Sequence, residues 1–139
     1  MARLDLKATK SVRKRQLAEL VAERLIALGH EAQVVTGHLN ASGHRDQVIV
    51  HSSLGLVHTT ASKSTDPNAA ILVSDIEDDS QLFLEGKAWV AYGWVDRSGR
   101  TLVQFVRTEH VMGHRSMLKT EVTRLANRQL STVFAPASD

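Results

Sequence analysis

The fold is decided by residues 88–107, which read AWVAYGWV (88–95), DRSGR (96–100) and TLVQFVR (101–107). Both outer runs are rich in β-branched and aromatic residues, which favour strands. The polar turn between them contains Gly99, and two apolar runs around such a turn are typical of a β-hairpin. We therefore expect a hairpin at the centre of the fold.

Three of the chain's few aromatic residues lie in the first of these strands: Trp89, Tyr92 and Trp94. Trp89 and Trp94 are an odd number of residues apart, so strand alternation predicts that they point to opposite faces of the sheet. We expect at least one of them to lie at an edge or at a contact with another chain. The alternative is that all three rings are core side chains.

An amphipathic helix is predicted over residues 11–28, upstream of the hairpin. Thr9 or Ser11 can cap its start, and Gly29 can end it in the left-handed conformation. Apolar residues recur at helical spacing along one face. These residues are Leu17, Leu20, Val21, Leu25 and Leu28.

Strand-like runs fill much of the chain between the helix and the hairpin, at residues 30–36, 46–52, 54–61 and 70–74. A final helix is predicted from about residue 116 to residue 130 by the helical spacing of its apolar residues. Its expected inner face carries Leu118, Val122, Leu125 and Ala126. The predicted fold class is α+β: an N-terminal amphipathic helix, an antiparallel β-sheet with a hairpin, and a C-terminal helix.

The length of 139 residues suits one domain, with a basic N-terminal arm at 1–10 and a C-terminal tail at 131–139. The chain contains no cysteine, which excludes disulfides and thiolate metal sites. Charged residues occupy the start, where a signal peptide needs an apolar run. No apolar run approaches the ~18 residues that span a bilayer. We therefore expect no membrane insertion and no conventional export.

The formal net charge of +2 conceals a segregated pattern. Residues 1–15 contain six cations and one anion, and residues 64–86 contain six anions and no cation. Residues 97–128 contain seven cations and two anions. Such blocks mark either a nucleic-acid surface or oppositely charged faces that meet in an assembly. Separately solvated surfaces are the third interpretation.

A small Mg²⁺-dependent nuclease of the PD-(D/E)xK type is the enzymatic alternative, built from Asp46, Glu85 and Lys87. Two carboxylates would hold the metal ion, and the lysine would orient the attacking water. The two-residue spacing of Glu85 and Lys87 allows both side chains to lie on one face of a strand. Gly86 between them weakens that strand, and a Glu-x-Lys pair arises easily by chance.

No bound metal ion or other cofactor is expected from the seven histidines. His110 and His114 are four residues apart, but Gly113 interrupts the helix that this spacing needs. The chain has no Cys nucleophile, no Gly-x-Ser-x-Gly elbow and no phosphate-binding Gly-rich loop between a strand and a helix. We therefore expect a protein that is not an enzyme.

Three separated stretches resemble the neck or tail-completion proteins of long-tailed bacteriophages. Residues 36–42 (TGHLNAS) match that family's Thr-Gly-x-Leu-x-x-Ser motif in full. Residues 90–93 (VAYG) match its Val-Glu-aromatic-Gly segment except at Ala91, where the family has an acid. Residues 116–120 (SMLKT) resemble the Pro-Phe-Leu-Arg-Pro-Ala motif at the start of its C-terminal helix, without the prolines.

This resemblance implies a structural virion protein that joins the head connector to the tail tube. Its subunits would form a ring, expected to hold six copies, around a passage for DNA. Its partners would be further copies, other neck and tail-tube proteins and, non-specifically, the passing DNA, with no membrane contact. We expect the subunit contacts to include Asp75, Glu77, Asp78, Asp79, Trp89 and Tyr92.

Two alternatives to this assignment stay open. The acidic segment can instead line the channel, where like charge would keep DNA from adhering. The chain can also be a small non-catalytic protein that binds DNA or a host protein through its basic ends.

Overall fold

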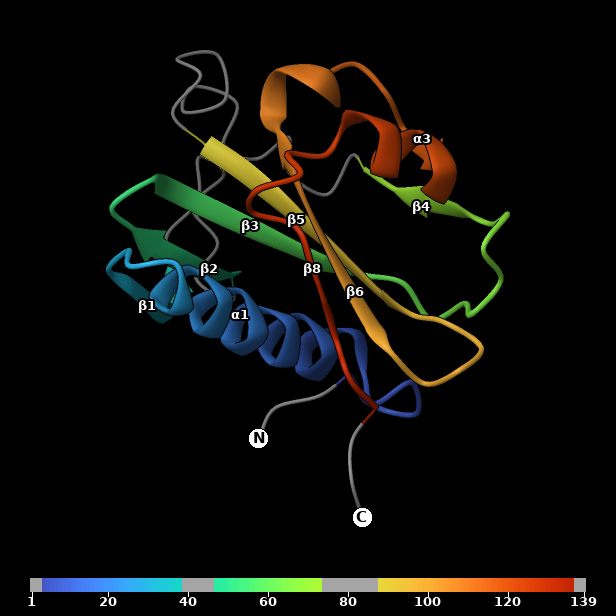
Figure 1. Cartoon of the computed structure of the whole chain (residues 1–139), viewed down its shortest axis with the longest axis horizontal. Helices are drawn as coiled ribbons and strands as arrows, with labels where there is room; N and C mark the ends of the chain where they lie inside the picture. Colours follow the sequence, from blue (N-terminus) through green and yellow to red (C-terminus); the bar gives the residue numbers. More distant parts are fainter. Residues whose placement is uncertain (1–3, 39–46, 74–87, 137–139) are drawn as a thin grey trace.

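The computed structural model describes residues 4–38, 47–73 and 88–136 (Figure 1). A long helix comes first, most strands follow it, and a short helix lies near the C-terminus. In chain order the elements are α1 (Lys10–Ala27), β1 (Ala32–His38), β2 (Gln47–Ser52), β3 (Gly55–Ala61), β4 (Ala70–Leu72), β5 (Ala88–Val95), β6 (Thr101–Arg107), the 3-10 turn η2 (Thr108–His110), β7 (Ser116–Leu118), α3 (Lys119–Leu125) and β8 (Thr132–Phe134).

The main sheet has six strands in the order β1-β2-β3-β5-β6-β8. Four of the five neighbouring pairs are antiparallel, and β3 and β5 form one parallel pair. The predicted α+β class is confirmed, but the sheet is mixed rather than purely antiparallel. A parallel pair requires a crossover connection. The connection from β3 to β5 includes β4, which pairs with β7 in a separate two-stranded sheet.

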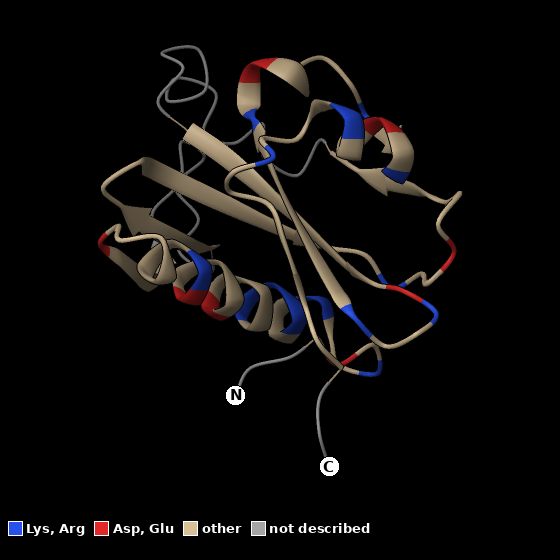
Figure 2. Cartoon of the chain, viewed as in Figure 1, with Lys and Arg blue, Asp and Glu red and all other residues tan. Residues whose placement is uncertain are grey.

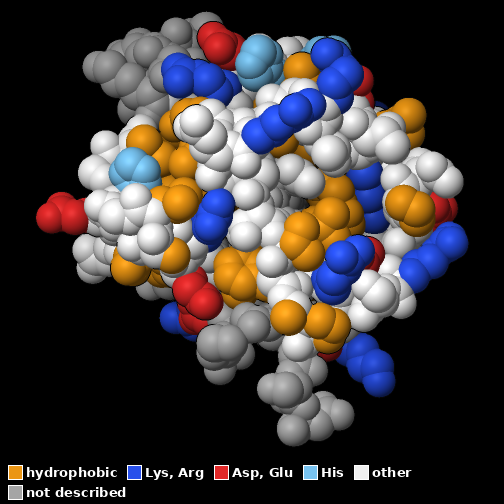
Figure 3. Space-filling view, in the orientation of Figure 1, with side chains coloured by type: hydrophobic (Ala, Val, Ile, Leu, Met, Phe, Trp, Pro, Cys, Tyr) orange, Lys and Arg blue, Asp and Glu red, His pale blue; other side chains and the backbone are white. Residues whose placement is uncertain are grey.

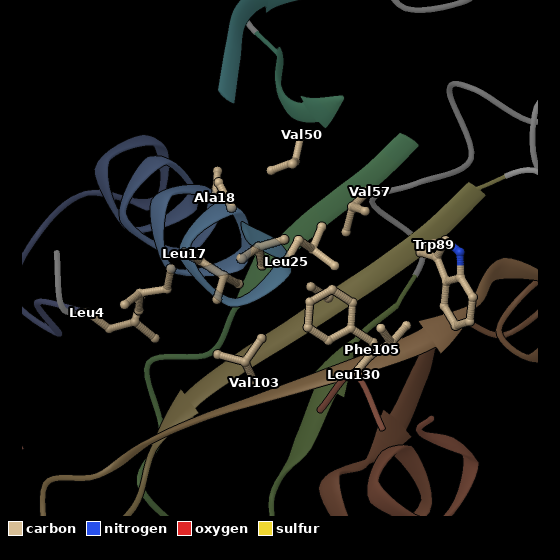
Figure 4. Close-up of a cluster of buried hydrophobic side chains, with 14 residues drawn as sticks. Leu4, Leu17, Ala18, Leu25, Val50, Val57, Trp89, Val103, Phe105 and Leu130 are labelled. Atoms are coloured by element: carbon tan, nitrogen blue, oxygen red, sulfur yellow. The ribbon is translucent and has the colours of Figure 1, made fainter. Parts of the chain in front are cut away.

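The sheet separates two hydrophobic clusters. Helix α1 covers one face, where its leucines meet Val57, Ala91 and Phe105 (Figures 1 and 4). The other face packs against β4, β7 and α3 through residues such as Ile71 and Val122. The result is a three-layer arrangement in which the central strand β5 is buried on both faces.

The aromatic residues of β5 divide between the two clusters as strand alternation predicts. Trp89 lies on the α1 side, whereas Tyr92 and Trp94 lie on the other side. All three are buried, with exposed fractions of 8%, 0% and 5%. The core alternative is therefore confirmed for these rings, and the expectation that one lies at an edge or an exposed contact is wrong for the single chain.

Helix α1 is confirmed nearly as predicted. The Thr9 side chain accepts a hydrogen bond from the Val12 amide, and Gly29 ends the helix with φ of 91°. Leu17 of α1 packs directly on Gly93 of β5. A Cβ atom added at Gly93 would lie only 2.6 Å from Leu17 Cδ1. Gly93 therefore lets the helix lie close to the sheet.

The hairpin is confirmed at both strand boundaries, and Asp96 organises its turn. Asp96 Oδ1 accepts hydrogen bonds from the Ser98 hydroxyl at 2.7 Å and from the backbone amides of Ser98 and Arg100. Its Oδ2 accepts from Arg100 Nε at 2.9 Å. Gly99 adopts a positive φ of 86°, which closes the turn. Hydrogen bonds from Ser98 and Arg100 lower the pKa of Asp96 to about 2.

We predict that Asp96→Asn lowers stability at neutral pH but not in strong acid. Because the folded pKa of about 2 lies below the ordinary 3.8, the carboxylate stabilises the fold above the unfolded pKa. That contribution disappears as the pH falls through the folded pKa. Urea unfolding of both proteins at several pH values checks this. The difference in unfolding free energy between wild type and Asp96→Asn should stay constant above the ordinary pKa of 3.8 and shrink as the pH falls toward about 2. A difference that does not change with pH would contradict the prediction.

The predicted C-terminal helix over residues 116–130 is wrong at both ends. Residues 116–118 pair with β4 as β7, so strand pairing overrides the helical spacing there. Helix α3 ends at Leu125, and Ala126 is extended. The Asn127 side chain then accepts hydrogen bonds from the amides of Gln129 and Leu130, a local bond pattern that competes with a helix.

Both predicted terminal extensions are partly integrated into the fold. Leu4 is buried in the α1-side cluster, so the arm at 1–10 is not wholly free, and Lys10 already belongs to α1. Residues 132–134 pair with β6 as β8, so the predicted tail at 131–139 is wrong in its first half. No helix within the described ranges is long and apolar enough to cross a membrane.

Candidate assembly surface

The β4–β7 ribbon exposes two leucines on its outer face. Ile71 pairs with Met117 at the centre, and both side chains point into the core. Strand alternation turns their neighbours outward. Leu72 and Leu118 are therefore 50% and 53% exposed. We define the outer face of this ribbon by Ala70, Leu72, Ser116 and Leu118.

Lys119 fixes the ribbon to the loop before β4. Its backbone amide donates to Ala69 O at 3.0 Å. Its buried ammonium donates to Ser64 O at 2.6 Å and to Asp66 O at 2.9 Å. Nζ also lies 5.5 Å from the centre of the Trp94 ring, within range of a cation–π contact. Burial lowers the pKa of the Lys119 amine, and the Asp66 carboxylate partly opposes this.

A basic pocket of about 230 Å³ lies beside the ribbon, at the first turns of α1. Lysine and arginine residues also gather along the N-terminal half of α1 in Figure 2. Strand β4 forms one wall of the pocket, and the end of β3 forms another. We define the basic pocket by its polar lining residues Lys10, Arg13, Thr60, Ser62 and Lys63.

A wider hollow of about 430 Å³ lies between β6, α3 and β8. Figure 3 shows a hollow on this face, with apolar side chains on its wall and cationic side chains beside it. Gln104, Arg124 and Arg128 are among its lining residues. Arg124 hydrogen-bonds to Glu121, which raises the pKa of the arginine and lowers that of the glutamate. Arg124 at the rim of this hollow is therefore already paired with Glu121.

The predicted site residues fall into two groups. Asp75, Glu77, Asp78 and Asp79 lie outside the described residues, and so do Asp46, Glu85 and Lys87 of the nuclease alternative. Trp89 and Tyr92 are described, and both are buried within the chain. Tyr92 therefore offers no exposed area to a partner, and Trp89 offers little. Within the described ranges, no three His, Asp or Glu side chains gather in a group that could hold a metal ion.

Two features of this surface were missed from the sequence. The helical spacing of Leu118, Val122 and Leu125 predicts that Leu118 lies on the inner face of a helix, which is wrong because Leu118 belongs to β7. If residues 116–118 were known to be a strand with Met117 inward, alternation would place Leu118 outward. Three residues are too few to distinguish the period of a strand from that of a helix. Leu72 sits in the continuous apolar run AAILV at 69–73, which shows no alternation by itself.

The described parts of the motif segments occupy defined places in the fold, whereas residues 39–42 of the first motif lie outside the described residues. Gly37 adopts φ of 71° at an irregularity in the β1–β2 pairing, one residue before the strand ends. Ala91, where the family has an acid, is buried on the α1 side of β5. Residues 116–120 form β7 and begin α3. Comparisons with protein-family models, curated proteins and solved structures find no match to this chain.

Proposed function

We propose that this chain is a structural subunit of a bacteriophage neck or tail end, which assembles into a ring that joins the head connector to the tail tube. The exposed leucines of the β4–β7 ribbon are the observation that carries the proposal. The segregated charges and the order of the three motifs support it. The task of such a subunit is contact with its neighbours, not catalysis.

The ribbon has the properties of a contact between chains. A two-stranded sheet consists only of edge strands, which are places where another chain can pack or pair. Leu72 and Leu118 lie diagonally across this ribbon, and their half-exposed side chains offer apolar area that an interface can bury. Leu72 and Leu118 are held on a rigid support, because Ile71 and Met117 anchor the ribbon in the core and Lys119 anchors the adjoining loop. The ribbon therefore needs little ordering when a partner docks.

A head-to-tail ring requires two different complementary patches on each subunit. The ribbon is one patch in this proposal. The acidic residues Asp75, Glu77, Asp78 and Asp79 supply charge for a second contact with a basic neighbouring face. The proposed ring thus combines an apolar contact with an electrostatic one.

The double variant Leu72→Glu/Leu118→Glu is expected to abolish assembly and leave the fold intact. Two carboxylates on the ribbon would have to be desolvated at the contact, and this cost is large for unpaired charges. Native mass measurement together with far-UV circular dichroism checks the prediction. Both replaced side chains are half exposed, so the monomer should unfold at a similar temperature.

Ile26→Glu is the matched control for this experiment. Ile26 is 57% exposed on α1, away from the ribbon, and the change places one exposed carboxylate there, where the double variant places two on the ribbon. It should leave the assembly unchanged. If the double variant assembles as well as the wild type, the ribbon is not the contact; if Ile26→Glu also prevents assembly, the loss reflects added charge and not the ribbon.

A further inference from the structure

Arg13 is a buried cation whose charge is not balanced within the described part of the chain. The residue is only 4% exposed. Its NH1 atom donates to Ala8 O at 2.6 Å. Its Nε atom is buried and has no hydrogen-bond partner in the described structure. A guanidinium has five N–H donors and keeps its charge, so burial with one neutral acceptor is costly.

The surroundings of Arg13 add charge and donors of the same kind. Lys10 and Lys63 line the same pocket, which gives it three cationic side chains. Thr60 lines it as well, and its buried hydroxyl has no partner among the described residues. The pocket lies at the N-terminal end of an 18-residue helix, where the helix dipole favours anions. No carboxylate is among the described residues that line it.

We propose that the basic pocket binds a phosphate group. Phosphate carries more negative charge than a carboxylate, so it balances the buried Arg13 together with the exposed Lys63 better. Its oxygens suit the planar N–H fork of Arg13, and a small side-chain rotation that uncovers the buried Arg13 Nε and Thr60 Oγ1 would let both atoms donate to it. The phosphate can come from a small phosphate ester or from a nucleic-acid backbone, which present the same chemistry. The evidence for this phosphate site is Arg13 and the lining of the basic pocket, and it does not depend on the proposed ring.

Thermal unfolding in inorganic phosphate, compared with chloride at equal ionic strength, tests the site. Phosphate at ten times its dissociation constant should raise the wild-type unfolding temperature by about 5 °C. Phosphate also stabilises many proteins non-specifically. The specific effect is therefore the difference between the wild type and variants of the pocket.

Lys63→Gln should weaken phosphate binding at least tenfold, because it removes an exposed cation that lines the pocket. Arg15→Gln is the matched control. Arg15 is exposed on α1 and lies outside the pocket, and its replacement removes the same charge as Lys63→Gln. It should keep the wild-type response. An equal loss in both variants would mean that only net charge matters, and it would overturn the proposal.

Arg13→Met tests the central cation. Methionine fills similar space without a buried charge, so this variant should unfold in chloride no earlier than the wild type. Its specific response to phosphate should be lost. Thr60→Val, a change of similar shape, should fold and weaken the response. If Arg13→Met and Thr60→Val both keep the full phosphate response, the pocket is not the site.

Competition experiments distinguish the sources. If a single-stranded or duplex oligonucleotide competes with inorganic phosphate, and Arg13→Met and Lys63→Gln weaken its binding but Arg15→Gln does not, the source is a nucleic-acid backbone. If only phosphate and mononucleotides bind, the source is a small phosphate ester. A synthetic peptide of residues 74–86 tests a carboxylate ligand. Binding of this peptide in the pocket, unaffected by phosphate, would overturn the proposal.

Discussion

Gly93→Ala is expected to lower the free energy of unfolding by about 2 kcal/mol. An alanine in a strand interior is normally favoured over glycine by roughly 0.5–1 kcal/mol, so a glycine without a packing role would give the opposite sign. Here the added Cβ would lie 2.6 Å from Leu17 Cδ1 and 3.3 Å from its Cγ. Leu17 is completely buried and cannot swing into solvent. The overlap therefore outweighs the gain in chain entropy.

A double-mutant cycle in denaturant isolates this contact. Leu17→Ala alone should cost about 3 kcal/mol, because it leaves a cavity between helix and sheet. In Gly93→Ala/Leu17→Ala, the new methyl group occupies part of that cavity. The double variant should be at least as stable as Leu17→Ala alone. Additive losses from the two substitutions would show that Gly93 does not set the helix–sheet distance.

Lys119→Ala is expected to cost about 3 kcal/mol and to release the loop before β4. The change removes a buried side chain that packs on Trp94 and donates to Ser64 O and Asp66 O. Lys119→Met keeps the aliphatic volume but loses both hydrogen bonds, so we expect a smaller cost of about 1 kcal/mol. Urea unfolding measures the stabilities. Limited proteolysis measures the protection of residues 62–68.

The two substitutions separate packing from hydrogen bonding. Both should increase cleavage in residues 62–68, since both remove the ammonium that holds the loop carbonyls. Arg124→Met removes an exposed cation from the same helix and should leave this loop as protected as in the wild type. Wild-type protection in Lys119→Met would show that the loop does not depend on the buried ammonium.

The central part of the fold could be predicted because local signals and tertiary packing agree there. The hairpin over 88–107 has continuous apolar runs and a turn with Gly99, and its boundaries are confirmed. Helix α1 has an apolar face, a cap at Thr9 and a stop at Gly29, and it is confirmed within a residue or two. In both cases the residues that start and end the element are themselves strong signals.

The C-terminal region could not be predicted because its structure depends on distant partners. Nothing local indicates that residues 116–118 pair with β4, or that residues 132–134 add to β6. The parallel pairing of β3 with β5 is likewise set by a crossover and not by either strand's sequence. Nothing in residues 88–95 indicates that Gly93 accommodates a side chain of the helix.

The candidate surface was only partly accessible from the sequence. Contact with charged partners is one interpretation of the charge segregation, which includes six cations before α1 and in its first turns. The charge segregation could not show that Arg13, unlike its neighbour Arg15, is buried beside a pocket. Helical spacing also put Leu118 in the core, although strand pairing exposes it. Both features depend on which elements pack together.

Negative-stain imaging of the purified chain, with native mass measured on the same sample, tests the proposed function most directly. We predict closed rings, with six copies of the 15.3 kDa chain expected from the family resemblance. The rings should disappear in Leu72→Glu/Leu118→Glu and persist in Ile26→Glu. A wild-type protein that stays a single 15.3 kDa chain at high concentration, with no ring in any image, would contradict the proposal.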